Sequence, residues 1–251
     1  MTLLIAFLPI AAFGIVWALE RVAPAAPGPA HDRWDWTLNL VGLAVQGAGV
    51  PLLGLWLTRD VLAPALPQLA GALAIGFWGA FALNFIAIDL LYYLQHRAWH
   101  KGPLWRLHIA HHAGARVDVW ATSRNTSWAS FLFVYFLINP WAALLCDSPE
   151  GFYLGASATA ALDLWRHGRI DYRRLGLDGA MRALAAVLIV PAAHFRHHDA
   201  AKPNANFGAN LSIWDRLFGT YEVPVAAPAS SAALDAPSPL RQLLWPFGAR
   251  S

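Results

Sequence analysis

Charged residues are scarce in this chain, and their scarcity excludes most classes of soluble protein. Asp, Glu, Lys and Arg make up 13% of the 251 residues, whereas hydrophobic residues make up 57%. A soluble domain of this size carries roughly 25% charged residues. The composition therefore excludes a soluble globular enzyme and a disordered chain. It predicts an integral membrane protein with one compact domain.

Cysteine is almost absent, and runs of basic residues are short. Cys146 is the only cysteine, which excludes an internal disulfide and any metal site built from several thiolates. The formal charge is only +3, and no run of Lys and Arg is longer than two residues. Nucleic acid is therefore not an expected partner. Contact with a membrane surface explains the basic residues better.

Several catalytic signatures are also missing. The three glutamates, Glu20, Glu150 and Glu222, lie far along the chain from the histidine clusters described below. As a result, neither the Glu-x-x-His motif of soluble di-iron bundles nor His-Glu-x-x-His occurs. A Gly-rich phosphate loop and a G-x-S-x-G elbow are absent too, so phosphoryl transfer and serine hydrolysis lose support.

Long apolar runs dominate the chain instead. A membrane-spanning helix needs about 20 such residues. Four runs reach or approach that length, at 3–19, 38–57, 66–94 and 129–146, and a shorter one covers 151–165. The first run lacks the basic segment that opens a signal peptide, so a span is favoured there. We expect an all-α integral membrane helical bundle of about four spans, with a short or re-entrant segment at 180–193.

The distribution of charge predicts the topology and the division of the chain. Basic residues gather in the segments 97–124, 166–182 and 196–216, whereas the loop 147–150 carries two acids and no base. The positive-inside rule places the basic segments in the cytoplasm, as a helical cap that carries the histidine clusters. We expect an N-terminal transmembrane region at 1–88, a catalytic region at 89–222 and a flexible C-terminal tail, rich in Ala, Pro and Ser, at 223–251.

Eight of the ten histidines fall into three clusters. The clusters are His96 and His100; His108, His111 and His112; and His194, His197 and His198. On a helix, residues three and four apart share one face, so each cluster presents its imidazoles together. Eight imidazoles are too many for one tetrahedral metal ion and predict two metal ions. Imidazole binds Fe, Zn, Cu and Ni alike, so the ligand type does not choose the metal.

Four further residues are candidates for the same site. His167 is a ninth possible ligand, and Asp163 lies four residues before it on the same helical face, where a carboxylate could orient the imidazole. Asp89 lies two helical turns before His96 and could orient that ring in the same way. Asn125 belongs to a polar interruption and could reach a metal directly or through water.

With these motifs, the sequence resembles the fatty acid hydroxylase / sterol desaturase superfamily of membrane di-iron oxygenases. The resemblance runs from about residue 89 to residue 221. It is carried by Asp89-Leu-Leu-Tyr-Tyr93, the three histidine clusters, Leu104-Trp105-Arg106, Arg124-Asn125, His167, Asn206-Phe-Gly208 and Ile213-Trp-Asp-Arg-Leu-Phe-Gly-Thr-Tyr221. Two positions depart from the family pattern. Thr126 stands where many members have the histidine of Arg-x-His, and His167-Gly-Arg169 replaces His-x-Asn.

The resemblance implies a non-haem centre of two iron ions at the cytoplasmic face of the membrane. It implies His96, His100, His108, His111, His112, His194, His197 and His198 as ligands, and His167 matches the additional histidine of the family. It also implies O2-dependent hydroxylation or desaturation of a lipid chain or sterol-like substrate that enters from the bilayer. The ending of the matched region favours the sterol desaturase branch over a carotenoid hydroxylase or an acyl desaturase.

Electrons must come from another protein in this interpretation, because the chain has no nucleotide fingerprint, cysteine cluster or fused haem domain. We expect a ferredoxin- or cytochrome-type donor with its reductase. The amino-acid composition is rich in Ala, Leu and Arg, as in proteins from high-GC bacteria. We therefore expect the protein in a bacterial inner membrane. The alternatives are a membrane zinc hydrolase, a non-enzymatic metal-binding protein, a pH-sensing histidine cluster and a haem site.

Overall fold

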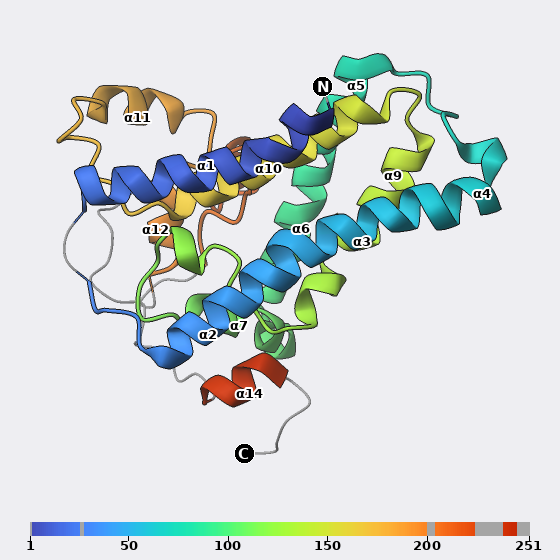
Figure 1. Ribbon diagram of the computed structural model, residues 1–251. Coiled ribbons are helices and arrows are strands. Elements are labelled where there is room, and N and C mark those ends of the chain that lie inside the picture. The colour runs from blue at the N-terminus through green and yellow to red at the C-terminus, as the bar shows by residue number, and fades with distance from the viewer. Residues whose placement is uncertain (1, 26–27, 200–203, 224–237, 245–251) are drawn as a thin grey trace.

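A computed structural model describes residues 2–25, 28–199, 204–223 and 238–244 of the chain (Figure 1). Every regular element within these ranges is a helix, and the extended pairings there amount to three isolated β-bridges. The expected all-α fold is therefore confirmed.

Three helices of the described chain are long and apolar enough to cross a membrane. Their apolar stretches are Ile5–Val22, Arg33–Ala65 and Gly76–Trp99. The first lies within α1 (Thr2–Val22). The second comprises α2 (Arg33–Gly42), η1 (Leu43–Gly49), α3 (Val50–Trp56), η2 (Leu57–Leu62) and α4 (Ala63–Ala65). The third comprises α5 (Gly76–Ala82), η4 (Leu83–Ile88) and α6 (Asp89–Trp99). Large apolar side chains such as Ile10, Leu52 and Trp78 are exposed on them, as expected of surfaces that face lipid.

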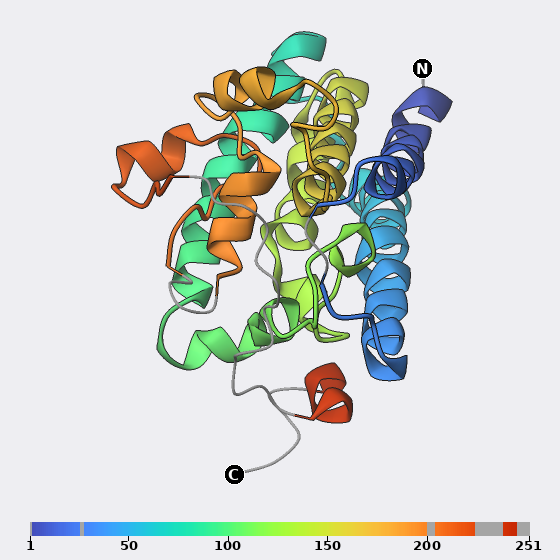
Figure 2. The same cartoon turned by 90° about the vertical axis from the view of Figure 1, so that its left-hand side faces the viewer.

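A fourth long helix, α10 (Pro149–His167), lies at the centre of the fold. It begins with a proline, has Glu150 in its first turn and has Arg166 and His167 in its last turn, which suits the helix dipole at both ends. Figure 2 shows α10 between α1 on one side and α5 on the other, and it packs against both. Small residues make this packing close. A Cβ atom on Gly151 would lie 2.0 Å from the carbonyl oxygen of Phe77 in α5.

The expected span at 129–146 is wrong as a single helix. The structure divides it into η7 (Ala129–Leu132), α8 (Val134–Leu137) and α9 (Asn139–Leu145). The first break falls at Phe133, whose backbone is extended, and the second precedes Pro140, which lacks an amide proton to continue the preceding helix. The third expected span also begins later, at Gly76. The preceding stretch holds a short 3-10 turn at Pro67, and Gly71 and Gly76 have positive φ.

Short helices complete this part of the fold, and two of them, α7 and α12, carry histidines. They are η5 (Gly102–Leu107), α7 (Ile109–His112), η6 (Val119–Ala121), α11 (Asp178–Leu184), α12 (Pro191–His197) and α13 (Ile213–Leu217). Rings of α12 lie against rings of α6 and α7, because the ring centroid of His197 is 4.5 Å from that of His96 and 4.7 Å from that of His112.

Part of the expected flexible tail is a folded helix. Residues 224–237 and 245–251 lie outside the described residues, but α14 (Pro239–Leu244) is described. The backbone N–H and the hydroxyl of Ser127 both donate to the carbonyl oxygen of Leu243, at 3.1 and 2.8 Å. These bonds hold α14 against the segment that follows the second histidine cluster.

The close approach of α10 and α5 gives a testable prediction. Gly151→Ala should lower stability by about 1–3 kcal/mol, because the added methyl group collides with backbone that has no side chain to move aside. Gly14→Ala is the matched control, since no atom lies within 4 Å of the added Cβ in α1. Thermal unfolding in detergent measures both. Equal midpoints for the two variants would contradict the packing described for α10.

Candidate metal centre

Nine buried or partly buried histidines converge in two adjacent groups. The first group is His96, His100, His108, His112 and His197, and the second is His111, His167, His194 and His198. Within each group the possible ligand nitrogens all lie within 4.8 Å of one another. All nine ligands expected from the sequence are therefore brought together, from α6, α7, α10, α12 and the residues that cap them.

The grouping differs from the three clusters in the sequence. Pairs four residues apart stay together, such as His108 with His112 and His194 with His198. The remaining member of each triplet joins the other group, so neighbours in sequence such as His197 and His198 belong to different groups. Adjacent helical residues point about 100° apart, which places them in different sites when both sides of the helix are enclosed. The sequence had grouped the histidines by helical face and left open how they divide between two metal ions.

Backbone carbonyl groups fix the orientation of four imidazoles. The Nδ1 atoms of His96 and His197 donate to the carbonyl oxygens of Phe207 and Ala205, at 2.7 and 2.8 Å. In the second group, Nδ1 of His111 donates to Arg124 at 3.1 Å, and Nδ1 of His167 donates to Asp163 at 2.8 Å. A neutral imidazole carries one ring proton, so Nε2 of each presents a lone pair. Two such nitrogens therefore face inward in each group.

Opposed lone pairs make a cation the natural partner of these nitrogens. Nε2 of His111 and Nε2 of His167 are 3.3 Å apart, and the carbonyl bonds leave neither of them a proton to share. In the first group, Nε2 of His197 and both ring nitrogens of His112 are buried without a hydrogen-bond partner among the described residues. Buried polar atoms are rarely left unsatisfied. The residues present thus fit two metal ions held by imidazole nitrogen.

The electrostatic environment keeps the rings neutral, as metal ligands must be. Burial lowers the pKa of His111 to about 3, and the neighbouring His167 contributes to the shift. Burial likewise lowers the pKa of His197 to about 3. The same cause, with neighbouring imidazoles adding to it, holds the pKa values of His112 and His198 well below the usual value.

Asp163, Asp89 and Asn125 were predicted to support the histidines, and the structure gives each of them different contacts. Asp163 is where the sequence suggested, with a carboxylate oxygen 3.2 Å from Nδ1 of His167. Asp89 makes no hydrogen bond to a histidine of the described chain. Its carboxylate accepts instead from the backbone N–H groups of residues 209–211 and from the indole of Trp214. It therefore supports the loop whose Phe207 carbonyl orients His96, rather than the ring itself.

Asn125 lines a small cavity that touches both groups. The cavity has a volume of about 20 Å³, which is room for roughly one water molecule. Its lining residues are Gln46, Tyr92, His108, His111, Thr122, Asn125, Phe133, Tyr135, Asp163, His167 and His194. The side-chain oxygen of Asn125 accepts from the N–H of Thr126 at 2.9 Å.

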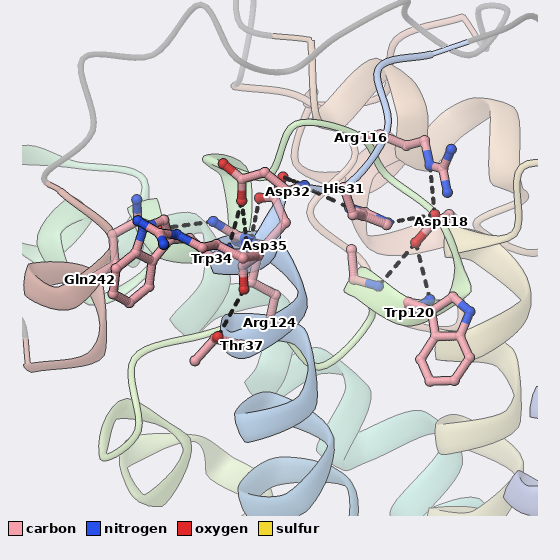
Figure 3. A network of polar contacts seen from close by, with 12 residues as sticks. His31, Asp32, Trp34, Asp35, Thr37, Arg116, Asp118, Trp120, Arg124 and Gln242 are labelled. Atoms are coloured by element: carbon pink, nitrogen blue, oxygen red, sulfur yellow. Dashed lines mark hydrogen bonds and ion pairs between the residues drawn. The ribbon is translucent and has the colours of Figure 1, made fainter.

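Sequence reasoning missed the buried pair that holds the carbonyl of Arg124 in place. The guanidinium of Arg124 donates to Asp35 of α2 at 2.8 Å and to Gln242 of α14 at 3.1 Å (Figure 3). It also donates to the carbonyl of Ala110 at 2.9 Å. Asp35 is far away in sequence and looks like an ordinary cap of α2. In the sequence, the only indication of this buried pair was the Arg124-Asn125 motif.

Asn206 is a second residue whose role only the structure reveals. It is fully buried and has a φ of 55°, a conformation that Asn tolerates better than most residues. Its side-chain amide donates to the carbonyl of Ala193 at 2.9 Å, and its side-chain oxygen accepts from the N–H of Glu222 at 2.9 Å. Asn206 thus ties α12 to the segment 205–207 that orients two histidines.

Together these features define a helical membrane protein with a buried pair of histidine sites able to hold metal ions. The family model for fatty acid hydroxylase matches residues 81–220, more than half of the chain. The chain belongs to the fatty acid hydroxylase family. The resemblance found in the sequence motifs is therefore confirmed.

Similar proteins include several lipid-modifying enzymes. Ornithine lipid hydroxylase OlsE of Rhizobium tropici is 31% identical over 175 residues, covering 66% of this chain and 49% of that protein. Alkylglycerol monooxygenase of Xenopus tropicalis is 28% identical over 144 residues, covering 55% and 30%. Very-long-chain aldehyde decarbonylase GL1-1 of Oryza sativa subsp. indica is 25% identical over 199 residues, covering 78% and 30%. The chain thus spans about half or less of these relatives, and no solved structure matches it.

The division of neighbouring histidines between two sites predicts the metal content of single variants. His197→Ala and His198→Ala should each retain about one of two metal ions per chain, because each removes a ligand from a different site. Elemental analysis of the purified variants measures the content, and the double variant should lose both ions. Loss of both ions in each single variant would contradict two separable sites.

The side chain of Asp163 should strengthen metal binding by its effect on the neighbouring ring of His167. Asp163→Asn is expected to lower metal affinity about 10- to 100-fold, since the carboxylate that lies 3.2 Å from Nδ1 of His167 loses its charge. Competition with a chelator measures the affinity, and circular dichroism checks the fold. Asp178→Asn is the matched control, because Asp178 forms an exposed ion pair with Arg182 four residues away. Equal affinities in the two variants would exclude an orienting role for Asp163.

Proposed function

We propose that this chain is a membrane-bound, non-haem di-iron oxygenase that uses O2 to hydroxylate the hydrocarbon chain of a lipid. The observation that carries the proposal is the pair of adjacent sites in which neutral, buried imidazoles direct lone pairs at one another. Membership of the fatty acid hydroxylase family supports it, as do relatives named as lipid hydroxylase and monooxygenase.

The number of ligands favours iron over zinc. Structural zinc sites are almost always tetrahedral with four ligands. The first group offers five histidines, which suits a metal that accepts a higher coordination number. His96, His100, His108, His112 and His197 would hold one iron. His111, His167, His194 and His198 would hold the other.

Two irons held in this way would supply the activation of O2 that oxidation of an unactivated C–H bond requires. In the overall reaction one oxygen atom enters the C–H bond as a hydroxyl group and the other leaves as water. This balance needs two electrons and two protons from outside. The chain's own residues hold the metals, exclude bulk water and leave the small cavity beside both groups. The histidines act as ligands and not as general bases.

The electron donor in this proposal is a separate ferredoxin- or cytochrome-type protein with its reductase. Basic residues on the face that carries the histidines would attract an acidic partner. We place that face in the cytoplasm and the protein in a bacterial inner membrane, because Lys and Arg gather in the segments around the histidine clusters. The lipid would then reach the site from the bilayer.

Oxygen labelling tests the reaction. Membranes containing the iron-loaded protein, supplied with ¹⁸O2, NAD(P)H, reductase and ferredoxin, should yield a lipid that gains a hydroxyl group carrying ¹⁸O. His112→Ala should lose most of this activity, since it removes a ligand from the first site. Mass spectrometry of the extracted lipids measures the label.

The outcomes separate the proposed reaction from its alternatives. A lipid that loses two hydrogens without gaining label would identify an acyl desaturase, and a label found in a carotenoid would identify a carotenoid hydroxylase. A label that comes from H2¹⁸O and appears without O2 consumption would identify hydrolysis and overturn the oxygenase. Gly14→Ala serves as the control variant, because no atom lies within 4 Å of the added Cβ, and it should retain full activity.

A further inference from the structure

A second and larger cavity lies apart from the histidine groups, where α1 ends and α2 begins. Its volume is about 380 Å³, within the range of small-molecule sites. Its lining residues are Glu20, Arg21, Pro24, Ala25, Gly28, Trp36, Arg116, Asp118, Trp120 and Arg169. None of them belongs to the two histidine groups, so this cavity is a separate site.

The carboxylates of the cavity are already occupied by the protein. Asp118 accepts from His31 at 2.8 Å, from Arg116 at 2.7 Å and from two backbone N–H groups of η6 (Figure 3). Glu20 accepts from the backbone N–H groups of Val119 and Arg169, at 3.0 and 2.9 Å. Both acids therefore stabilise the walls of the cavity and need no ligand.

Arg21 and Arg116 have hydrogen-bonding capacity to spare within the described chain. Arg116 uses only its Nε atom there, and its side chain is 30% exposed. Arg21 stacks on Trp17 of its own helix and donates one hydrogen bond to that residue's carbonyl. Arg169 is buried and lines the same cavity. Three guanidinium groups thus line one space, in which an anion could accept charge-assisted hydrogen bonds from Arg21 and Arg116.

The place of the cavity in the fold indicates where the anion comes from. Glu20 and Arg21 lie in the last turn of the first candidate membrane span, and Trp36 lies in the first turn of the second. The cavity is therefore at the level where the two helices leave the bilayer. Trp36 and Trp120 form its apolar wall, with ring centroids 5.3 Å apart, and tryptophan is enriched at membrane interfaces. Basic pockets between spans at this level suit the head groups of anionic lipids.

We propose that this cavity binds the phosphate of an anionic membrane phospholipid, with Arg21, Arg116 and Arg169 contacting the head group. The lipid is held by its charge, while its acyl chains lie along the exposed apolar side of α1. This site does not depend on the metal chemistry, because its residues and the histidine ligands are different.

Lipid binding to the purified full chain tests the proposal. The delipidated protein in neutral detergent is titrated with phosphatidylglycerol, phosphatidylcholine and inorganic phosphate, and bound species are counted by native mass spectrometry. Phosphatidylglycerol should bind about 10-fold or more tightly than phosphatidylcholine. The double variant Arg21→Gln, Arg116→Gln should lose that preference. Arg173→Gln, Arg174→Gln is the matched control, since both arginines are exposed and pair with Asp171.

Other outcomes of this experiment would overturn the proposed phospholipid site. Equal binding of the two phospholipids, or an unchanged preference in the double variant, would overturn the proposal. Displacement of phosphatidylglycerol by an equal concentration of inorganic phosphate would mean a site for free anions instead of lipid. If the double variant fails to fold, Arg21→Gln alone replaces it, because Arg21 is exposed and bonds only to its own helix. Unchanged metal content in the variants keeps this test independent of the oxygenase proposal.

Discussion

The hydrogen bond from an imidazole Nδ1 to a backbone carbonyl is the interaction on which the rest of the site depends. Four such bonds, made by His96, His111, His167 and His197, turn the Nε2 lone pairs inward. Burial lowers the pKa values of His111 and His197 to about 3. The carbonyl bond of each ring takes the single proton of a neutral imidazole on Nδ1, so the facing Nε2 nitrogens have none to share. The geometry of the backbone around the histidines therefore decides whether two metal ions can be held.

Buried polar side chains hold those carbonyl groups in position. Asp89 and Asp215 receive backbone N–H groups of the segment 207–211, and Asn206 bridges it to α12. Arg124 does the same for the second group by joining α2, α7 and α14. Each of these residues would be costly to bury without partners. Their cost is offset because each one fixes several backbone groups at once.

The membrane requires apolar side chains on the outside of the fold, whereas the metal sites require polar side chains inside it. The fold places these two kinds of side chain in different regions. The outer faces of α1, the 33–65 helix and α5 expose apolar side chains, while buried polar residues gather around α6, α7 and α12. Arg21 and Trp36 lie at the boundary between these regions, where the lipid head-group cavity is proposed. One small chain thus presents apolar surface to lipid and keeps a dry, nitrogen-rich interior beside it.

The sequence by itself determined the class of fold, because apolar runs long enough to span a bilayer leave a helix as the simplest structure that satisfies the backbone. The sequence was also enough to identify the nine histidines as candidate ligands, eight of them from their clustered spacing. It pointed to Asp163 because that residue lies one helical turn before His167. Only the tertiary structure decided how the histidines divide, because neighbours such as His111 and His112 point in different directions from a helix whose surroundings lie far away in sequence. It also reassigned Asp89 and broke the run 129–146 at Phe133 and Pro140, since burial and long-range hydrogen bonds leave no periodic signal in the sequence.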